Sequence, residues 1–342
     1  MHVKHIYTVC LILSCLNSLS QNIDSEYVNI NGVLQWIYYM GKDTTKPIIL
    51  FLHGGPGTAE TPFLEKFNSN LKDSFIIACW EQRGAGKSYS RKIPDSTMTM
   101  KQFILDTYEV TQYLKKKFNR EKIYLMGHSW GTLLGIRMVK RNPTDFIAYF
   151  ALAQTSNAFQ EEIITYNWLL KNAFEEPNKK AIKQLEEIEE PQDGKRLSFT
   201  DMSTKMRWVN YYGGASFYKN RKGFNKLAKT VITAKMYSFW DKLKYLKSEK
   251  YTLNFLYNQI ADVNLKNEID TLEIPIVFFH GSNDYQVPIK VARDYYEFVS
   301  APYKSFVQFN NCAHGLLIEK PEKFKKELLN EIEKIKMFSP AQ

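Results

Sequence analysis

A serine at position 129 is bracketed by two glycines in the stretch GHSWG, residues 127–131. The apolar run EKIYLM precedes it, and the helix-like run TLLGIRMVK follows it. Glycine loses much backbone entropy on folding, so two of them around one hydroxyl need a reason. The pattern G-x-S-x-G is typical of a tight strand-to-helix turn that exposes the serine oxygen as a nucleophile. Ser129 is therefore a candidate nucleophile, and the competing interpretation is an ordinary turn that contains a serine.

A nucleophilic serine needs a histidine base, and the base needs an acid that orients it. His314 follows the β-like run YKSFVQF and precedes a helical pattern, and Asp284 follows the β-like run IPIVFFHG. Loops at the ends of neighbouring strands can bring both side chains to Ser129. The order serine, aspartate, histidine along the chain is one in which such triads occur. We therefore predict that Ser129, Asp284 and His314 are catalytic.

Three other histidines are weaker candidates for the base. His53, in FLHGGPG, ends a β-like run but has no acid placed for it. His128 adjoins Ser129 inside the tight turn, so its side chain should point away from the nucleophile. His280 precedes a glycine at the end of a β-like run, and we expect it to pack in the interior.

The elements that must position these residues alternate along the chain. Apolar β-like runs end in glycine-rich or polar loops, and helical patterns separate them, as in KPIILFLHGG, DSFIIACWEQRG, EKIYLMG and DFIAYFALAQ. This alternation predicts an α/β fold with a mostly parallel sheet and helices on both faces. Ligands bind such sheets at the carboxyl ends of the strands. Near the start, Asn31-Gly32 between two β-rich runs predicts a hairpin.

The middle of the chain breaks this alternation. Residues 156–262 hold charged, aromatic-rich helical patterns and no convincing buried strand. A helical cap inserted into the fold is the expected arrangement, with core segments at 21–155 and 263–342 on either side. No internal repeat is present.

The first twenty residues, MHVKHIYTVCLILSCLNSLS, have a basic start, a short apolar run and small residues near the end. This pattern predicts a signal peptide at 1–20, cleaved before Gln21, and hence export to the periplasm or the medium. Lipoprotein anchoring through Cys15 is a less favoured alternative, because the residues before it fit that pattern only loosely. The apolar run is too short to span a bilayer, and no other stretch predicts a transmembrane helix.

The formal charge is +10, and removing residues 1–20 removes one lysine and leaves +9. The lysines alternate with glutamates in helical patterns such as EKFKKELLNEIEKIK, which is typical of solvated helix faces rather than of a nucleic-acid site. The stretch GAGKS lacks the first glycine of a phosphate loop, since Glu81 holds that position.

Cys79 and Cys312 form no zinc-binding spacing and are either a disulfide or two buried thiols. We expect no metal and no cofactor.

Four motifs together resemble a known family: HGGPG at 53–57, WEQRGAGKS at 80–88, GHSWG at 127–131 and AHGLLIEKPEKF at 313–324. They are similar to the proline iminopeptidase branch of the α/β-hydrolases. The resemblance implies a Ser-His-Asp hydrolase with a helical cap and no cofactor, and it assigns the triad to the three residues predicted above. It also places the oxyanion donors at the backbone N–H groups of Gly55 and Trp130. Glu81 stands where many members have aspartate, and the cap has no clear match to the aminopeptidase cap motifs.

The expected function is release of an N-terminal residue, with proline a candidate, from a short peptide or another small-molecule substrate. A substrate ammonium entering a closed pocket needs a carboxylate partner. Cap acids near the junction with the core are candidates, namely Glu161, Glu162 and Asp241, and Trp240 is a candidate wall for a proline ring. Two alternatives remain: an esterase or amidase with the same machinery, and a binding protein of the same fold without turnover.

Overall fold

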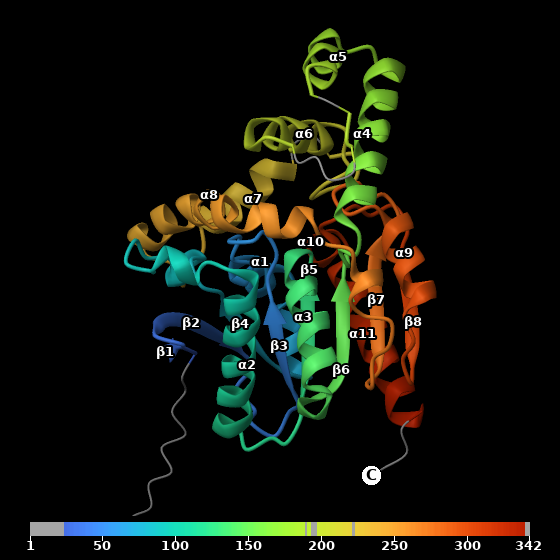
Figure 1. Ribbon diagram of the computed structural model, residues 1–342. Coiled ribbons are helices and arrows are strands. Elements are labelled where there is room, and N and C mark those ends of the chain that lie inside the picture. Colours follow the sequence, from blue (N-terminus) through green and yellow to red (C-terminus); the bar gives the residue numbers. More distant parts are fainter. Residues whose placement is uncertain (1–23, 189, 193–196, 221–222, 339–342) are drawn as a thin grey trace, which may run out of the picture.

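The computed structural model describes residues 24–188, 190–192, 197–220 and 223–338, so the expected signal peptide lies outside the described residues. At its centre is an eight-stranded sheet in the order β1-β2-β4-β3-β5-β6-β7-β8 (Figure 1). Its strands are β1 (Ser25–Ile30), β2 (Val33–Met40), β3 (Ile48–Leu52), β4 (Ile76–Glu81), β5 (Ile123–His128), β6 (Phe146–Leu152), β7 (Ile276–Gly281) and β8 (Lys304–Phe309). β2 pairs antiparallel with β1 and β4, and every later pair is parallel. The predicted mostly parallel sheet is confirmed.

A tight hairpin joins β1 to β2 at Asn31-Gly32, where the two φ angles are 45° and 81°. Both values lie in the left-handed region that asparagine and glycine tolerate best, which is why this dipeptide is a strong hairpin signal. The hairpin that the sequence predicts is therefore present.

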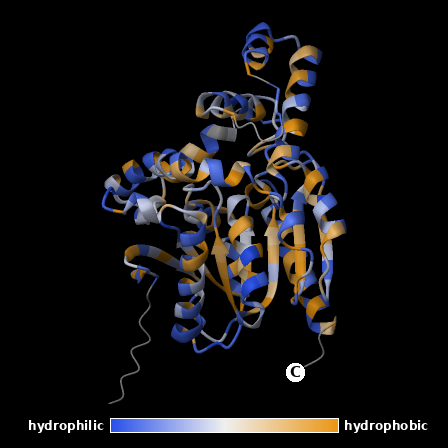
Figure 2. Ribbon diagram, viewed as in Figure 1, coloured by the Kyte–Doolittle hydropathy of each residue, from blue (hydrophilic) through white to orange (hydrophobic). Residues whose placement is uncertain are grey.

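The central strands are buried on both faces, and Figure 2 shows them as the most hydrophobic part of the molecule. In β3, alternate residues face opposite sides: Leu50 joins one hydrophobic cluster, and Phe51 joins the other. The first cluster includes side chains of α2 (Met100–Lys117), α3 (Trp130–Arg141) and α9 (Ile289–Phe298). The second includes side chains of α1 (Thr61–Phe67), α10 (Leu316–Glu319) and α11 (Pro321–Phe338). Helices thus cover both faces, as predicted.

Between β6 and β7 the chain leaves the sheet and forms five helices, with no strand among the described residues of this segment. They are α4 (Ala158–Glu175), α5 (Lys179–Glu186), α6 (Phe199–Tyr211), α7 (Gly223–Ile232) and α8 (Phe239–Ala261), seen at the top of Figure 1. Side chains of α4, α5 and α6 form a small hydrophobic cluster of their own around Leu169, Leu185 and Val209. The N–H of Leu265 donates to Ser156 O at 2.7 Å where the segment returns. The division into core and cap at residues 156 and 262 stays our prediction.

In the part of the chain that the structure describes, none of the helices is both long and apolar enough to cross a membrane.

Candidate active site

Ser129 occupies a strained turn between β5 and α3, with φ 52° and ψ −120°. A non-glycine residue in this region of backbone space costs energy and is characteristic of functional sites. Its N–H donates to Leu152 O at 2.9 Å, which fixes the turn to the neighbouring strand β6. A Cβ at Gly131 would overlap the Leu52 carbonyl, and one at Gly127 would lie 2.6 Å from Gly131 O. The two glycines are thus required by close backbone contacts around the serine.

Asp284 and His314 form an oriented acid–base pair at the ends of β7 and β8. The Nδ1 of His314 lies 2.7 Å from Asp284 Oδ2, and the other carboxylate oxygen accepts N–H bonds from Gln286 at 2.9 Å and Val287 at 2.8 Å. The carboxylate therefore requires the Nδ1–H tautomer of His314. Its Nε2 is buried and has no hydrogen-bond partner among the described residues, so it is available to take a proton.

Three segments that are distant in sequence meet at Ser129. Its neighbour His128 lies with its ring centroid 4.8 Å from that of His314 and its Nε2 3.2 Å from the His314 carbonyl. A Cβ built at Gly54 would lie 3.2 Å from Ser129 Cβ, so the HGGPG loop passes directly against the serine. The structure brings the predicted nucleophile, base and acid to one edge of the sheet.

The side chain of His128 turns to Glu60 at the start of α1, with Nδ1 2.6 Å from Oε1. Its other nitrogen faces the carbonyl of His314, so both ring nitrogens face acceptors and both must carry hydrogen. Burial alone would lower the pKa of His128, but the Glu60 carboxylate raises it above its ordinary value. Burial in turn would raise the pKa of Glu60, and His128 lowers it. We infer a buried imidazolium–carboxylate pair next to Ser129.

The backbone N–H groups of Gly55 and Trp130 are without a protein acceptor among the described residues. Trp130 is the first residue of α3, and N–H groups in the first turn of a helix have no intrahelical partner. The preceding N–H, of Gly54, donates to Glu60 at 3.3 Å. Gly55 has a φ of +111°, a conformation that glycine tolerates. These are the two N–H groups that the resemblance assigns to an oxyanion hole.

Gln82 of the WEQRG motif bonds both to the start of α3 and to the HGGPG loop. Its Oε1 accepts from the indole N–H of Trp130 at 2.9 Å, and its Nε2 donates to His53 O at 3.0 Å. His53 donates from Nδ1 to Gly54 O and accepts the Gln82 N–H at Nε2, so it is neutral. Burial lowers the pKa of His53 to about 4. His53 therefore holds the loop in place, and nothing places it as the base.

His280 is fully buried behind the acid, and its Nε2 lies 2.8 Å from Val287 O and 3.5 Å from Asp284 Oδ2. Burial lowers the pKa of His280, so the ring is neutral and donates from Nε2. It packs beside Asp284, and His314 holds the carboxylate oxygen at the shorter distance.

The three acids expected to anchor a substrate amine each have a partner within the protein. Glu161 is buried and accepts the N–H groups of Ser156 and Asn157 at the start of α4. Glu162 pairs with Lys205. Burial raises the pKa of Glu161 to about 8. Their assignment to the amine stays a prediction, and no contact within the chain adds support to it.

Asp241 forms a capping box with Ser238 at the start of α8, and its carboxylate lies 3.7 Å from the Lys87 ammonium. Trp240 beside it is 70% exposed and contacts Phe239, with ring centroids 5.4 Å apart. A residue that walls a substrate pocket is normally more buried than this. The role of Trp240 in binding a proline ring likewise stays a prediction.

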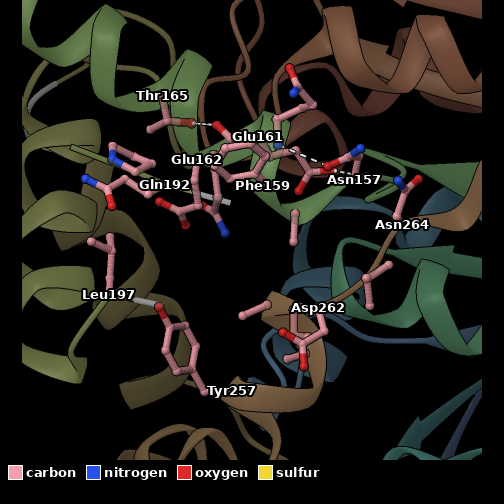
Figure 3. A pocket seen from close by; sticks show the side chains of 17 residues that line it. Asn157, Phe159, Glu161, Glu162, Thr165, Gln192, Leu197, Tyr257, Asp262 and Asn264 are labelled. Carbon is pink, nitrogen blue, oxygen red and sulfur yellow. Dashed lines mark hydrogen bonds between the residues drawn. The ribbon is translucent and has the colours of Figure 1, made fainter. Parts of the chain in front are cut away.

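Glu161 and Glu162 do line a cavity of about 480 Å³ at the base of the cap (Figure 3). Its other walls include Phe159, Tyr257 and Asn264, from α4, α8 and the segment after α8. As far as the structure describes the chain, its lining contains none of the triad residues. The cavity is therefore separate from the immediate surroundings of Ser129.

Sequence reasoning missed two parts of the site. Glu249 of α8 is an exposed residue near Thr58, which directly follows the HGGPG motif, and desolvation of its carboxyl raises its pKa. In the cap, the loop after α6 accepts the His314 N–H at Ala215 O and the Tyr285 N–H at Gly214 O, both at 2.8 Å. Nothing in the sequence around Glu249, which lies among lysines, marks it as a site residue. The Gly213-Gly214 pair predicts a turn, but the sequence does not show which loops that turn contacts.

Cys79 and Cys312 are both buried free thiols, so the disulfide alternative is wrong. Burial raises the pKa of both thiols, which makes them inert at neutral pH. In the ranges that the structure describes, no three histidine, cysteine, aspartate or glutamate side chains are grouped so as to hold a metal ion.

A family model described as alpha/beta hydrolase fold matches residues 47–321. A protein named "probable aminopeptidase YbaC" from Bacillus subtilis (strain 168) is 29% identical over 310 residues, which are 87% of this chain and 92% of that protein. A "probable proline iminopeptidase" of Streptomyces coelicolor is 27% identical over 42% of this chain and 44% of its own length.

Among solved structures, a proline iminopeptidase-related protein from Thermus thermophilus aligns with a TM-score of 0.65 at 15% identity, covering 92% of this chain and 99% of that one. An esterase from Rhodococcus sp. ECU1013 aligns with a TM-score of 0.60 at 15% identity, covering 92% and 100%. At this level of identity, the likeness extends to the fold alone.

Proposed function

The chain belongs to the alpha/beta hydrolase fold family, and from that premise we propose that it is a serine hydrolase that uses Ser129, His314 and Asp284. The observation that carries the proposal is the hydrogen bond between His314 Nδ1 and Asp284 Oδ2, with a buried and unpartnered Nε2 on the same ring. A histidine in this state is a ready proton acceptor for a nearby hydroxyl.

In the proposed mechanism, Ser129 Oγ attacks the substrate carbonyl and its proton passes to Nε2 of His314. Asp284 holds the ring and stabilises the imidazolium that forms. The carbonyl oxygen, now negative, accepts the N–H groups of Gly55 and Trp130. Each such donor lowers the barrier by roughly 3–4 kcal/mol in comparable sites. His314 then protonates the leaving group, and water releases the acyl group from Ser129 by the reverse sequence.

We further propose that the substrate is an aminoacyl compound, released from the N-terminus of a short peptide. Relatives named as aminopeptidases and proline iminopeptidases support this class. Within the chain, Glu60 and Glu249 place two carboxyl groups at the HGGPG loop, which carries the proposed oxyanion donor Gly55. Glu60 is held by His128, so Glu249 is the more available partner for a substrate ammonium.

A second candidate, an esterase or amidase acting on small non-peptide substrates, is favoured by the state of the expected cap acids. Glu162 is neutralised by Lys205, and Asp241 is committed to the start of α8. If neither can leave its partner, recognition of a free amine rests on fewer groups than we expected.

Reaction with a fluorophosphonate tests the nucleophile. The parent chain should be labelled at one serine, and Ser129→Ala should lose both the label and at least about a thousandfold in kcat. Labelling that persists in Ser129→Ala would place the reactive nucleophile elsewhere and refute its assignment to Ser129. No labelling of a correctly folded parent would leave a binding protein of the same fold.

Matched substrates then separate the two hydrolase classes. Aminoacyl arylamides, their N-acetylated forms and aryl esters are compared on the parent and on Glu249→Gln, Glu161→Gln, Glu162→Gln and Asp241→Asn. An aminopeptidase prefers the free amine, and the variant that removes the true anchor raises KM for that substrate and leaves KM for the acetylated one unchanged. A parent that prefers esters or acetylated substrates would favour the esterase or amidase.

A further inference from the structure

The first turns of α8 expose large apolar side chains, while hydroxyls lie on the buried side of the helix. Ser248 donates to Gly57 O at 2.8 Å, and Thr252 is also fully buried against the core. On the other side, Phe239, Trp240 and Leu246 are 67%, 70% and 74% exposed. Exposed apolar side chains gathered in this way mark an interaction surface more often than chance.

These exposed residues share one side of the helix with lysines. Positions 239, 243, 246 and 250 recur at helical spacing, so Phe239, Leu243, Leu246 and Lys250 lie along one stripe. Trp240 and Lys247 flank it, and we refer to these six residues as the outer face of α8. Lys247 and Lys250 are exposed and have no carboxylate partner among the described residues.

The charge around the outer face of α8 is strongly one-sided. Residues 226–250 contain seven lysines and two acids. Asp241 is buried and faces Lys87, which leaves Glu249 as the exposed acid of this stretch. The outer face of α8 therefore presents aromatic and aliphatic side chains within a field of positive charge.

The corner that leads into α8 is held rigidly. Tyr237 is 3% exposed and its hydroxyl donates to the buried Glu81, while the Lys87 ammonium donates to Met236 O at 3.1 Å. Because these contacts fix the start of the helix to the core, Phe239 and Trp240 cannot turn inward without breaking them. Their exposure follows from the architecture.

We propose that the outer face of α8 is a docking surface for an anionic phospholipid bilayer. Aromatic side chains on a helix lying in the plane of a membrane insert at the headgroup boundary, and lysines on the same helix attract anionic lipid. A protein partner of ordinary composition would not account for the excess of lysines. Docking would place the cap, and the active site beneath it, at the lipid surface.

Vesicle binding by the full chain tests the proposal. We expect binding to phosphatidylcholine vesicles with 30% phosphatidylglycerol and much weaker binding without it. The double variant Phe239→Ser/Trp240→Ser should weaken binding by at least about tenfold. Phe174→Ser/Met337→Ser removes two side chains of similar exposure elsewhere and should leave binding unchanged.

The charge contribution has its own matched pair. Lys247→Gln/Lys250→Gln should weaken binding by about thirtyfold, since each lysine near an anionic surface contributes about 1 kcal/mol. Lys180→Gln/Lys183→Gln, on α5, changes the net charge equally and should have little effect. Equal losses of vesicle binding in the two double variants would show that only the net charge of the protein matters, and would overturn the proposal.

Quenching of Trp240 fluorescence by brominated lipid reports directly whether the outer face of α8 inserts into the bilayer. The parent should lose more fluorescence than Trp240→Phe when bilayers carry brominated acyl chains. Equal quenching would overturn the proposal, as would a parent chain that binds no vesicle. A dimer in solution that Phe239→Ser/Trp240→Ser dissociates, with no vesicle binding, would assign the outer face of α8 to a second copy instead.

Discussion

Removing the carboxylate of Glu60 tests whether a charged pair supports the catalytic loop. Glu60 accepts from His128 and from the Gly54 N–H, and His128 in turn donates to the His314 carbonyl. Glu60→Ala leaves one charged and one neutral donor without an acceptor. At about 1.5–3 kcal/mol for the first and about 0.5–1.5 kcal/mol for the second, the variant should lose roughly 2–4.5 kcal/mol of stability.

Glu60→Gln separates charge from hydrogen bonding. A neutral His128 can still donate from Nε2 to the His314 carbonyl while Nδ1 accepts from the new amide, so this variant should lose about half as much as Glu60→Ala. Because the contact positions the His314 loop, we expect kcat to fall by about tenfold in Glu60→Ala and less in Glu60→Gln, with KM nearly constant.

The pKa shifts of His128 and Glu60 determine how the stabilising effect of their pair changes with pH. The folded pKa of His128 is raised, so its stabilising effect is complete below its ordinary value of 6.5 and is lost as the pH rises through the folded pKa. The folded pKa of Glu60 is lowered, so its effect is complete above its ordinary value of 4.5 and is lost as the pH falls through the folded pKa. The stability difference between parent and Glu60→Gln should therefore be largest between these values and shrink toward pH 8.

Urea unfolding of parent and variants from pH 5 to 8 measures that difference, with Glu109→Gln on the exposed side of α2 as the control. A constant difference across this range would mean that His128 is neutral in the parent. If Glu60→Ala matches the control in both stability and kcat, the pair does not support the site and the reasoning is refuted.

Three further outcomes are expected. Asp284→Asn should lower kcat by roughly a thousandfold or more while the protein stays folded, because the amide favours the wrong tautomer of the base; a loss below tenfold would contradict its role. Gly131→Ala should destabilise the chain by about 1–3 kcal/mol in urea unfolding, since its Cβ overlaps the Leu52 carbonyl, and an unchanged midpoint would show that the turn can relax. Gly214→Ala places a Cβ 2.6 Å from the Trp168 ring and should lower kcat more than it lowers the stability of the core; equal effects on both would make it a packing residue only.

The sheet could be predicted because its signals are local. The apolar runs of β3, β4, β5 and β7 are buried on both faces, which leaves almost no choice of partner except helices. The G-x-S-x-G turn could be predicted for the same reason. Its glycines are required by close backbone contacts within the turn and with the neighbouring strand β3. Asp284 and His314 followed from chain order at strand ends.

The roles of the cap acids could not be predicted in the same way, because each role depends on which side chains lie beside the acid in the folded structure. Glu161, Glu162 and Asp241 were chosen for their position near the core, and each is engaged by a helix end or by a lysine. Trp240 was expected to face inward, and the contacts that fix the start of α8 turn it outward. A helical pattern in sequence gives the spacing of a face but not the side to which that face turns.

The link between the cap and the triad shows where specificity in this chain is to be sought. The loop after α6 accepts N–H groups from the loops that carry the proposed base and acid, at His314 and Tyr285. Trp168 of α4 stacks on Tyr285 with ring centroids 4.1 Å apart. A shift of the cap would therefore move His314 and the Asp284 loop, the proposed base and acid. Since a displacement of the reacting groups by about 1 Å can cost a hundredfold in rate, cap contacts that never touch substrate can still decide which substrate is turned over.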